Sequence, residues 1–99
     1  MTIRILASAR DDLVDGWNFY EEREQGTGDY FLQCLFEDIA LLKDTAGLHR
    51  MVQGFHRSLS RRFPYAVYYL LHENEVRIHA VLDCRSNPKK IRQKLRQRR

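Results

Sequence analysis

The chain has 99 residues, the length of one domain, and a single core of that size needs no metal or disulfide to fold. With 43% hydrophobic and 30% charged residues, its composition excludes a disordered chain and a fibre. The formal net charge is +4, but it is divided unevenly. Residues 1–44 hold ten acidic and four basic side chains, whereas residues 45–99 hold three acidic and thirteen basic ones. The chain is therefore a charge dipole along its own sequence.

The cysteines and the apolar segments indicate the compartment. Neither Cys34 nor Cys84 belongs to a CxxC pair, so we expect two reduced thiols rather than a metal or redox motif. No apolar run is long enough to span a membrane, and the N-terminus lacks the features of a signal peptide. These features predict a cytoplasmic protein.

The first half of the chain predicts a strand followed by two helices. Alternation over residues 2–7 indicates a short strand, and Ser8 offers an N-cap for a helix over about residues 9–24. Gly16 is a weak point in that helix. After a loop with two glycines, a second helix with a wide apolar stripe is expected over about residues 29–44. The short loop between them predicts an antiparallel helical hairpin.

The second half predicts three strands. After an irregular loop over residues 48–54, strands are expected at residues 55–59, 66–71 and 76–82. The last has the clearest alternation, which directs Val76, Ile78, Ala80 and Leu82 to one face and places Arg77 and His79 on the other, less buried face.

This order of elements predicts an α+β fold, β-α-α-β-β-β, with the hairpin packed on a small, mostly antiparallel sheet. Residues 1–87 form the predicted single domain, and residues 88–99 form a basic C-terminal tail in which Asn87 and Pro88 could open a helix. Seven of these twelve tail residues are Lys or Arg, and none is acidic.

The candidate functional residues are basic. The sequence contains no common catalytic motif, and its four histidines are scattered, so no metal and no cofactor is expected. Five arginines from strands and connections could converge on one sheet face and bind phosphates or acidic groups. They are Arg57, Arg61, Arg62, Arg77 and Arg85. The alternative is that they only keep exposed strand faces soluble. The tail could likewise bind phosphates or a phospholipid surface, or be a solvated extension.

Three motifs in the second half resemble the RelE/ParE superfamily of bacterial toxins. Residues 63–69 read FPYAVYY, residues 76–83 read VRIHAVLD, and residues 85–88 read RSNP. Members of the superfamily often read R…RFPYxIYY, a turn, and then VxIxAVLHxxRxP. The first half agrees, with an opening strand followed by Ala9, Leu13, Tyr20, Phe31 and Ile39. One departure is Asp83, where many relatives carry His.

The resemblance implies a compact toxin of a type II toxin–antitoxin module, of the plasmid stabilisation type. Such a toxin inhibits growth and is neutralised by a cognate antitoxin from the same operon. The antitoxin is expected to be acidic where it binds, because the second half of this chain is so basic. The residues expected to bind the antitoxin or the target are Arg57, Arg61, Arg62, Arg77 and Arg85.

Two target classes exist in the superfamily. RelE-like members are ribosome-dependent mRNA endonucleases, whereas ParE-like members bind DNA gyrase and are not enzymes. The resemblance implies that a RelE-like activity here would use Arg57, Arg62 and Arg85, which match basic positions of the superfamily, as catalytic residues; His79 could substitute chemically for the base that such members carry near the chain's end. However, no tyrosine follows Arg85, and the usual general base is therefore missing.

The missing base favours the ParE-like, gyrase-binding interpretation. The endonuclease stays as the first alternative, so whether the protein is an enzyme is open. The second alternative is a non-toxic relative that only binds its antitoxin and co-regulates the operon.

Overall fold

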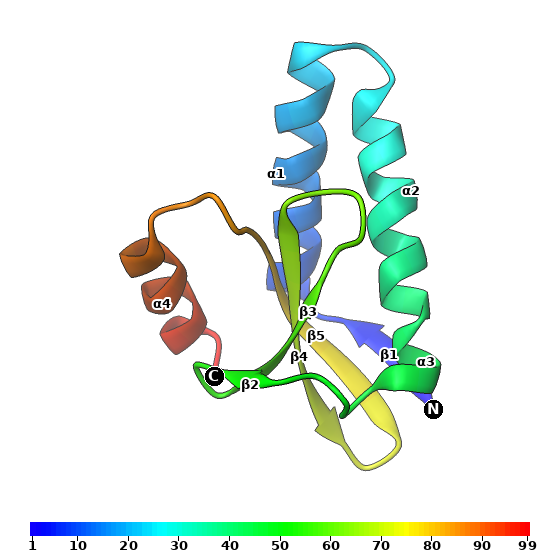
Figure 1. Ribbon diagram of the computed structural model, residues 1–99, viewed down its shortest axis with the longest axis vertical. Coiled ribbons are helices and arrows are strands. Elements are labelled where there is room, and N and C mark those ends of the chain that lie inside the picture. Colours follow the sequence, from blue (N-terminus) through cyan, green and yellow to red (C-terminus); the bar gives the residue numbers. More distant parts are fainter.

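The computed structural model describes all 99 residues and contains one five-stranded sheet with helices on both faces (Figure 1). The elements in chain order are β1 (Thr2–Ile5), α1 (Ala7–Arg23), α2 (Thr27–Ala40), α3 (Leu42–Thr45), β2 (Met51–Val52), β3 (Phe55–Leu59), β4 (Tyr65–His72), β5 (Glu75–Asp83) and α4 (Pro88–Gln97). The strand order is β1-β5-β4-β3-β2, in which only the β1–β5 pair is parallel. The predicted α+β fold, with a helical hairpin on a mostly antiparallel sheet, is confirmed.

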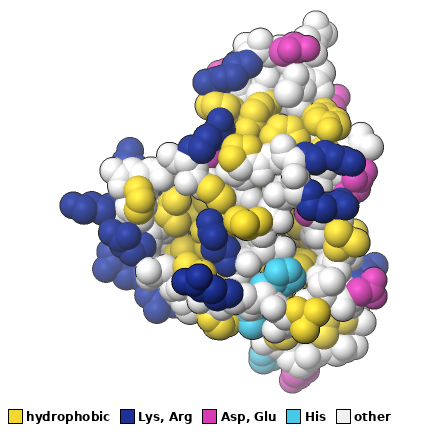
Figure 2. Space-filling view, viewed as in Figure 1, with side chains coloured by type: hydrophobic (Ala, Val, Ile, Leu, Met, Phe, Trp, Pro, Cys, Tyr) yellow, Lys and Arg dark blue, Asp and Glu magenta, His cyan; other side chains and the backbone are white.

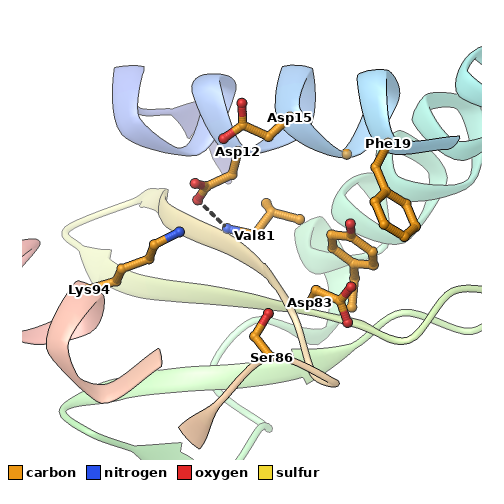
Figure 3. A pocket seen from close by; sticks show the side chains of 9 residues that line it. Asp12, Asp15, Phe19, Val81, Asp83, Ser86 and Lys94 are labelled. Atoms are coloured by element: carbon orange, nitrogen blue, oxygen red, sulfur yellow. Dashed lines mark hydrogen bonds between the residues drawn. The ribbon is translucent and has the colours of Figure 1, made fainter. Parts of the chain in front are cut away.

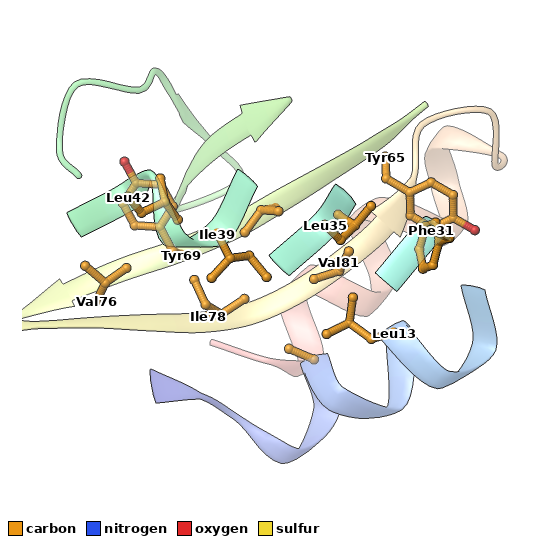
Figure 4. Packing of buried hydrophobic residues seen from close by; sticks show 12 residues of the cluster. Leu13, Phe31, Leu35, Ile39, Leu42, Tyr65, Tyr69, Val76, Ile78 and Val81 are labelled. Carbon is orange, nitrogen blue, oxygen red and sulfur yellow. The ribbon is translucent and has the colours of Figure 1, made fainter. Parts of the chain in front are cut away.

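The hairpin of α1 and α2 covers one face of the sheet and forms the larger core (Figure 4). Leu13 of α1 and Leu35 of α2 meet Val67, Ile78 and Val81 of the sheet there. Most of these side chains are branched or aromatic, as strands that are covered on one face by helices require. This core explains the wide apolar stripe of α2, which contacts α1 on one side and the sheet on the other.

The edge of the sheet contains a strand that the sequence analysis assigned to a loop. Met51 pairs with His56 and Val52 with Phe55, so β2 and β3 form a tight hairpin. The two residues between them, Gln53 and Gly54, have φ values of 54° and 84°. Two consecutive positive φ values make this the two-residue turn that matches strand twist, and glycine adopts such a conformation without strain.

The start of α1 also differs from the prediction. Its N-cap is Leu6, which gives no side-chain capping bond, and Ser8 lies inside the helix. The Ser8 hydroxyl instead donates to the carbonyl of His79 at 3.0 Å. Ser8 therefore joins α1 to β5 rather than capping the helix.

A β-bulge in β5 divides its side chains between the two faces differently from the predicted alternation. Tyr69 pairs with Ile78 and Tyr68 pairs with Ala80, so His79 is the extra residue. Ala80 and Leu82 consequently leave the hairpin side and join the second core, on the opposite face. The bulge shifts the alternation by one residue because the side-chain period of a strand is two.

The second face of the sheet is covered by α4, the segment expected as a basic tail. Asn87 caps this helix by accepting a hydrogen bond from the Lys89 amide at 2.9 Å. Leu95 is 0% exposed and packs in a core with Phe55, Tyr68 and Leu82. The helix is thus an ordered layer of the fold. None of the helices combines the length and the apolar character that crossing a bilayer requires.

Candidate binding groove between β3 and the C-terminal helix

The five candidate arginines are not gathered on one sheet face. Arg61 and Arg62 follow β3 and turn toward α2, where Arg61 Nε lies 2.8 Å from Asp38 Oδ1. The nearest carboxylate oxygen to Arg62 is Glu37 Oε2, at 3.5 Å. These two guanidinium groups therefore neutralise acids of the helical hairpin, and the expectation of one arginine surface is wrong.

Arg77 and Arg85 are likewise paired with carboxylates. Arg77 Nε is 2.6 Å from Glu75 Oε1, and this ion pair lowers the pKa of Glu75. Arg85 donates to both carboxylate oxygens of Asp83 and to the Tyr20 hydroxyl at 3.2 Å. The Asp83 carboxylate raises the pKa of Arg85 and keeps the cation beside it. Asp83, the residue that departs from the motif described above, thus serves as a partner for Arg85.

Arg57 is the one candidate arginine with no carboxylate partner. Its Nε donates to the Tyr68 hydroxyl at 3.2 Å, and one terminal nitrogen lies 3.5 Å from Cys84 Sγ. The hydrogen bond to Tyr68 is the main cause that raises the pKa of Arg57. Neither partner is a carboxylate, so Arg57 has no acidic partner within the chain.

Arg57 lines a groove of about 270 Å³ between the β2–β3 hairpin and α4. The residues that line this β3–α4 groove are Val52, Gln53, Arg57, Tyr68, Cys84, Pro88, Ile91, Arg92 and Leu95. Two guanidinium groups, those of Arg57 and Arg92, therefore stand over apolar side chains. Such a combination suits an acidic ligand that also has apolar surface, because arginine binds carboxylates in two-point geometry.

His79 lies apart from this groove, beneath the end of α4. Its Nδ1 donates to the Arg98 carbonyl at 3.0 Å, and its ring lies 5.1 Å from that of Phe55. Burial lowers the pKa of His79, so the ring is neutral near pH 7. The groove lining contains no histidine or carboxylate, and its tyrosine and cysteine, Tyr68 and Cys84, are both contacted by the Arg57 guanidinium, so the groove chiefly provides charge and shape for binding.

A second hollow, of about 200 Å³, lies between α1, β5 and α4 (Figure 3). Asp12, Asp15 and Asp83 line it, and the side chain of Lys94 extends toward the two α1 carboxylates. Nowhere in the chain do three or more His, Cys, Asp or Glu side chains meet as a metal ion would require.

Asp12 is a structural residue that the sequence analysis missed. It is 5% exposed, accepts from the Val81 amide at 2.9 Å, and forms an ion pair with Arg98. The sequence signal is its place on the same side of α1 as Ala9 and Gly16, three residues after the first and four before the second. A carboxylate on an apolar helix face needs a partner, and Arg98 supplies it.

The fold is similar to one in a known toxin–antitoxin system. A chain of the chromosomal ParDE TA system from P. aeruginosa superposes with a TM-score of 0.74 and 17% sequence identity. The match covers 82% of this chain and 92% of that chain. No protein-family model and no curated protein matches the sequence. The RelE/ParE-like fold that the sequence motifs implied is therefore confirmed.

Proposed function

We propose that this chain, whose fold is that of a chain of a ParDE system, is the toxin of a bacterial type II toxin–antitoxin module. The observation that carries the proposal is that the fold match and the sequence motifs agree independently. We further propose that it acts in the cytoplasm in the ParE-like way, by binding DNA gyrase, and that a cognate antitoxin neutralises it.

The chemistry of the β3–α4 groove supports binding rather than RNA cleavage. Cleavage by a ribose 2′-hydroxyl needs a general base within hydrogen-bonding reach of that hydroxyl. The groove has Arg57 and Arg92 but no histidine or carboxylate, its Tyr68 hydroxyl already accepts from Arg57, and His79 does not line it. Of the proposed catalytic set, Arg62 and Arg85 are also held by carboxylates away from Arg57.

The same groove suits an acidic segment of the antitoxin. Arg57 and Arg92 have no carboxylate partner within the chain, while Val52, Pro88 and Ile91 give the groove accessible apolar surface. The carboxylates of an acidic peptide would pair with the two arginines, and its apolar side chains would cover the apolar surface of the groove. Complex formation should then weaken as ionic strength rises and should weaken further in an Arg57→Gln variant. A complex indifferent to both would contradict docking at this groove.

Two assays run in parallel test the target. Purified protein is added to a gyrase supercoiling reaction and to a cell-free translation reaction. We expect supercoiling to be inhibited at micromolar protein and translation to continue. Inhibition of translation alone would instead support the endonuclease, and inhibition of neither would support the non-toxic relative.

Matched variants make these assays specific. Arg57→Gln removes the unpaired cation of the groove, and Arg10→Gln removes an exposed cation of α1 that lies on the other side of the sheet. If the groove also contacts the target, Arg57→Gln should weaken inhibition and Arg10→Gln should not. Equal effects of the two variants would show that only net charge matters.

A further inference from the structure

The outward face of α4 carries four basic side chains, of which the proposed function uses only Arg92, a residue that also lines the β3–α4 groove. Lys89, Lys90, Arg92 and Arg96 are exposed, lie within eight consecutive residues, and form no ion pair. Figure 2 shows Lys and Arg side chains gathered over the position that α4 occupies in Figure 1, with no acidic side chain among them. We call these four residues the α4 basic face.

The arrangement of these charges is unfavourable for the isolated helix. Lys89 and Lys90 lie in the first turn, where the helix dipole disfavours cations. Lys89 and Arg92 are three residues apart, and Arg92 and Arg96 are four apart, so like charges face each other along one side. Only Arg96, in the last turn, is placed where the dipole favours a cation. Helix stability therefore does not explain Lys89, Lys90 and Arg92, whereas a polyanion bound to the helix would neutralise all four charges.

The helix is also held rigidly enough to present its charges. The buried Leu95 anchors the middle of α4, Asn87 caps its start, and Arg98 pairs with the buried Asp12 near its end. The side of α4 that faces the sheet therefore provides its attachment, which leaves the α4 basic face free. We propose that the α4 basic face binds the phosphate backbone of duplex DNA, an interaction that goes beyond gyrase binding and shares only Arg92 with the proposed antitoxin groove.

The surroundings of α4 favour a duplex over a single strand. Proteins that bind single strands stack the bases on exposed aromatic rings. Here α4 has no aromatic residue, and the rings beneath it, Phe55 and Tyr68, are 0% and 2% exposed. Backbone phosphates of a duplex need only cations, and the major groove of B-DNA is wide enough for a helix.

The same geometry disfavours a membrane surface. A helix that lies in the lipid interface inserts an apolar side between the headgroups. The two large apolar residues of α4, Ile91 and Leu95, both pack against the sheet instead. The outward side offers charge alone.

The test measures the fluorescence anisotropy of a labelled duplex of about 20 base pairs with the full-length protein over a series of salt concentrations. Each phosphate contact contributes roughly −0.9 to the slope of log K against log salt, so four contacts predict a slope of about −3.6. The double variant Lys89→Gln/Arg96→Gln removes two of the four contacts, so the slope should become shallower, about −1.8. Binding at low salt should weaken about tenfold or more. The control Arg10→Gln/Lys43→Gln removes two exposed cations elsewhere and should leave the slope unchanged.

Three further probes decide the class of partner. A single strand of the same length, phosphatidylserine vesicles and polyglutamate are each titrated in the same buffer. Weaker binding of all three than of the duplex supports the proposal. Tighter binding of the strand, of the vesicles or of polyglutamate overturns it, and so does equal loss of duplex binding in the control variant. Because the readout is direct binding, failure here would leave the toxin proposal standing.

Discussion

Asp12 and Arg98 show how two residues at opposite ends of the sequence hold the fold together. Arg98 donates through both terminal nitrogens to the Asp12 carboxylate, and one of these bonds, to Oδ1, is 2.9 Å long. The other carboxylate oxygen also accepts from the Val81 amide. Three elements, α1, β5 and the end of α4, therefore meet at one buried carboxylate. Removing it would leave a cation and a backbone donor without partners.

The first prediction concerns this carboxylate. Asp12→Ala should lower the free energy of unfolding by about 3 kcal/mol or more, because it breaks a buried pair and leaves Arg98 uncompensated. Urea denaturation followed by circular dichroism measures the loss. Asp11→Ala is the matched control, since Asp11 is the exposed neighbour and should change stability by less than about 0.5 kcal/mol. Similar losses in the two variants would contradict the role given to Asp12.

The second prediction concerns pH. Burial and the nearby charges of Arg77 and Arg98 lower the pKa of His79 below the value of about 6.5 expected for the unfolded chain. The unfolded chain therefore takes up a proton more readily, so the stabilising contribution is complete above about pH 6.5 and is lost as pH falls through the lower, folded-state pKa. His79→Asn keeps a donor for the Arg98 carbonyl but does not titrate.

Urea midpoints of both proteins between pH 7.5 and pH 5, a range of about 2.5 units, should decrease less for the variant. Part of the dependence should remain in the variant, because burial also lowers the pKa of His49. An identical pH profile of the two proteins would show that His79 does not titrate differently in the folded chain.

At the scale of elements, the close approach of α1 to α2 depends on Gly16. A Cβ atom placed on Gly16 would overlap the ring of Phe31, which is 0% exposed. Phe31 in turn contacts the rings of Tyr20, Phe63 and Tyr65. The glycine that appears as a weak point of a single helix is thus what admits an aromatic ring between two helices.

The third prediction follows from this contact. In an exposed helix position, Gly→Ala usually stabilises by roughly 1 kcal/mol. Here Gly16→Ala should instead destabilise by about 1–3 kcal/mol, because the buried ring has no room to move. Asn18→Ala, on the exposed side of the same helix, is the control and should be neutral or slightly stabilising. A stabilised Gly16→Ala variant in urea denaturation would refute the packing argument.

The sequence predicted the elements well wherever side-chain period alone determines them. Helices α1 and α2 and strands β1, β3, β4 and β5 follow from apolar spacing, and the hairpin follows from its short glycine loop. The single helix expected over about residues 29–44 is divided into α2 and the short α3. The bulge at His79 was not predictable, because it depends on pairing with Tyr68 and Tyr69 of another strand. The pairing of Arg61 and Arg62 was missed for a similar reason, because their carboxylate partners, Asp38 and Glu37, lie far away in the sequence. The partners of Arg77 and Arg85 lie only two residues away, at Glu75 and Asp83, and this spacing was visible in the sequence.

The docking of α4 shows the same limit. The seven basic residues at positions 88–99 are typical of a solvated tail, and only two large apolar residues, Ile91 and Leu95, indicate contact with the sheet. Leu95 nevertheless reaches full burial, because Phe55, Tyr68 and Leu82 leave an apolar hollow on that face. Predicting that the tail docks on the sheet would have required knowing that Leu82 of β5 points to the same face as Phe55 and Tyr68.

Across the whole molecule, the charge dipole of the sequence becomes a partly neutralised body with an unpaired basic layer. Arg61 and Arg62 form ion pairs with carboxylates of α2, and Arg77 and Arg85 form ion pairs with carboxylates of β5. The cations that remain without acidic partners include Arg57 in the groove and the α4 basic face. A net charge of +4 therefore understates how basic one side of the molecule is.

The central claim is that the protein is a growth-inhibiting toxin, and controlled expression in a bacterial host without any antitoxin tests it most directly. Colony-forming units are counted after induction, while the level of soluble protein is followed in the same cells. The toxin account predicts that viable counts stop rising or fall as soluble protein accumulates. Undiminished growth with a high level of soluble, folded protein would contradict it.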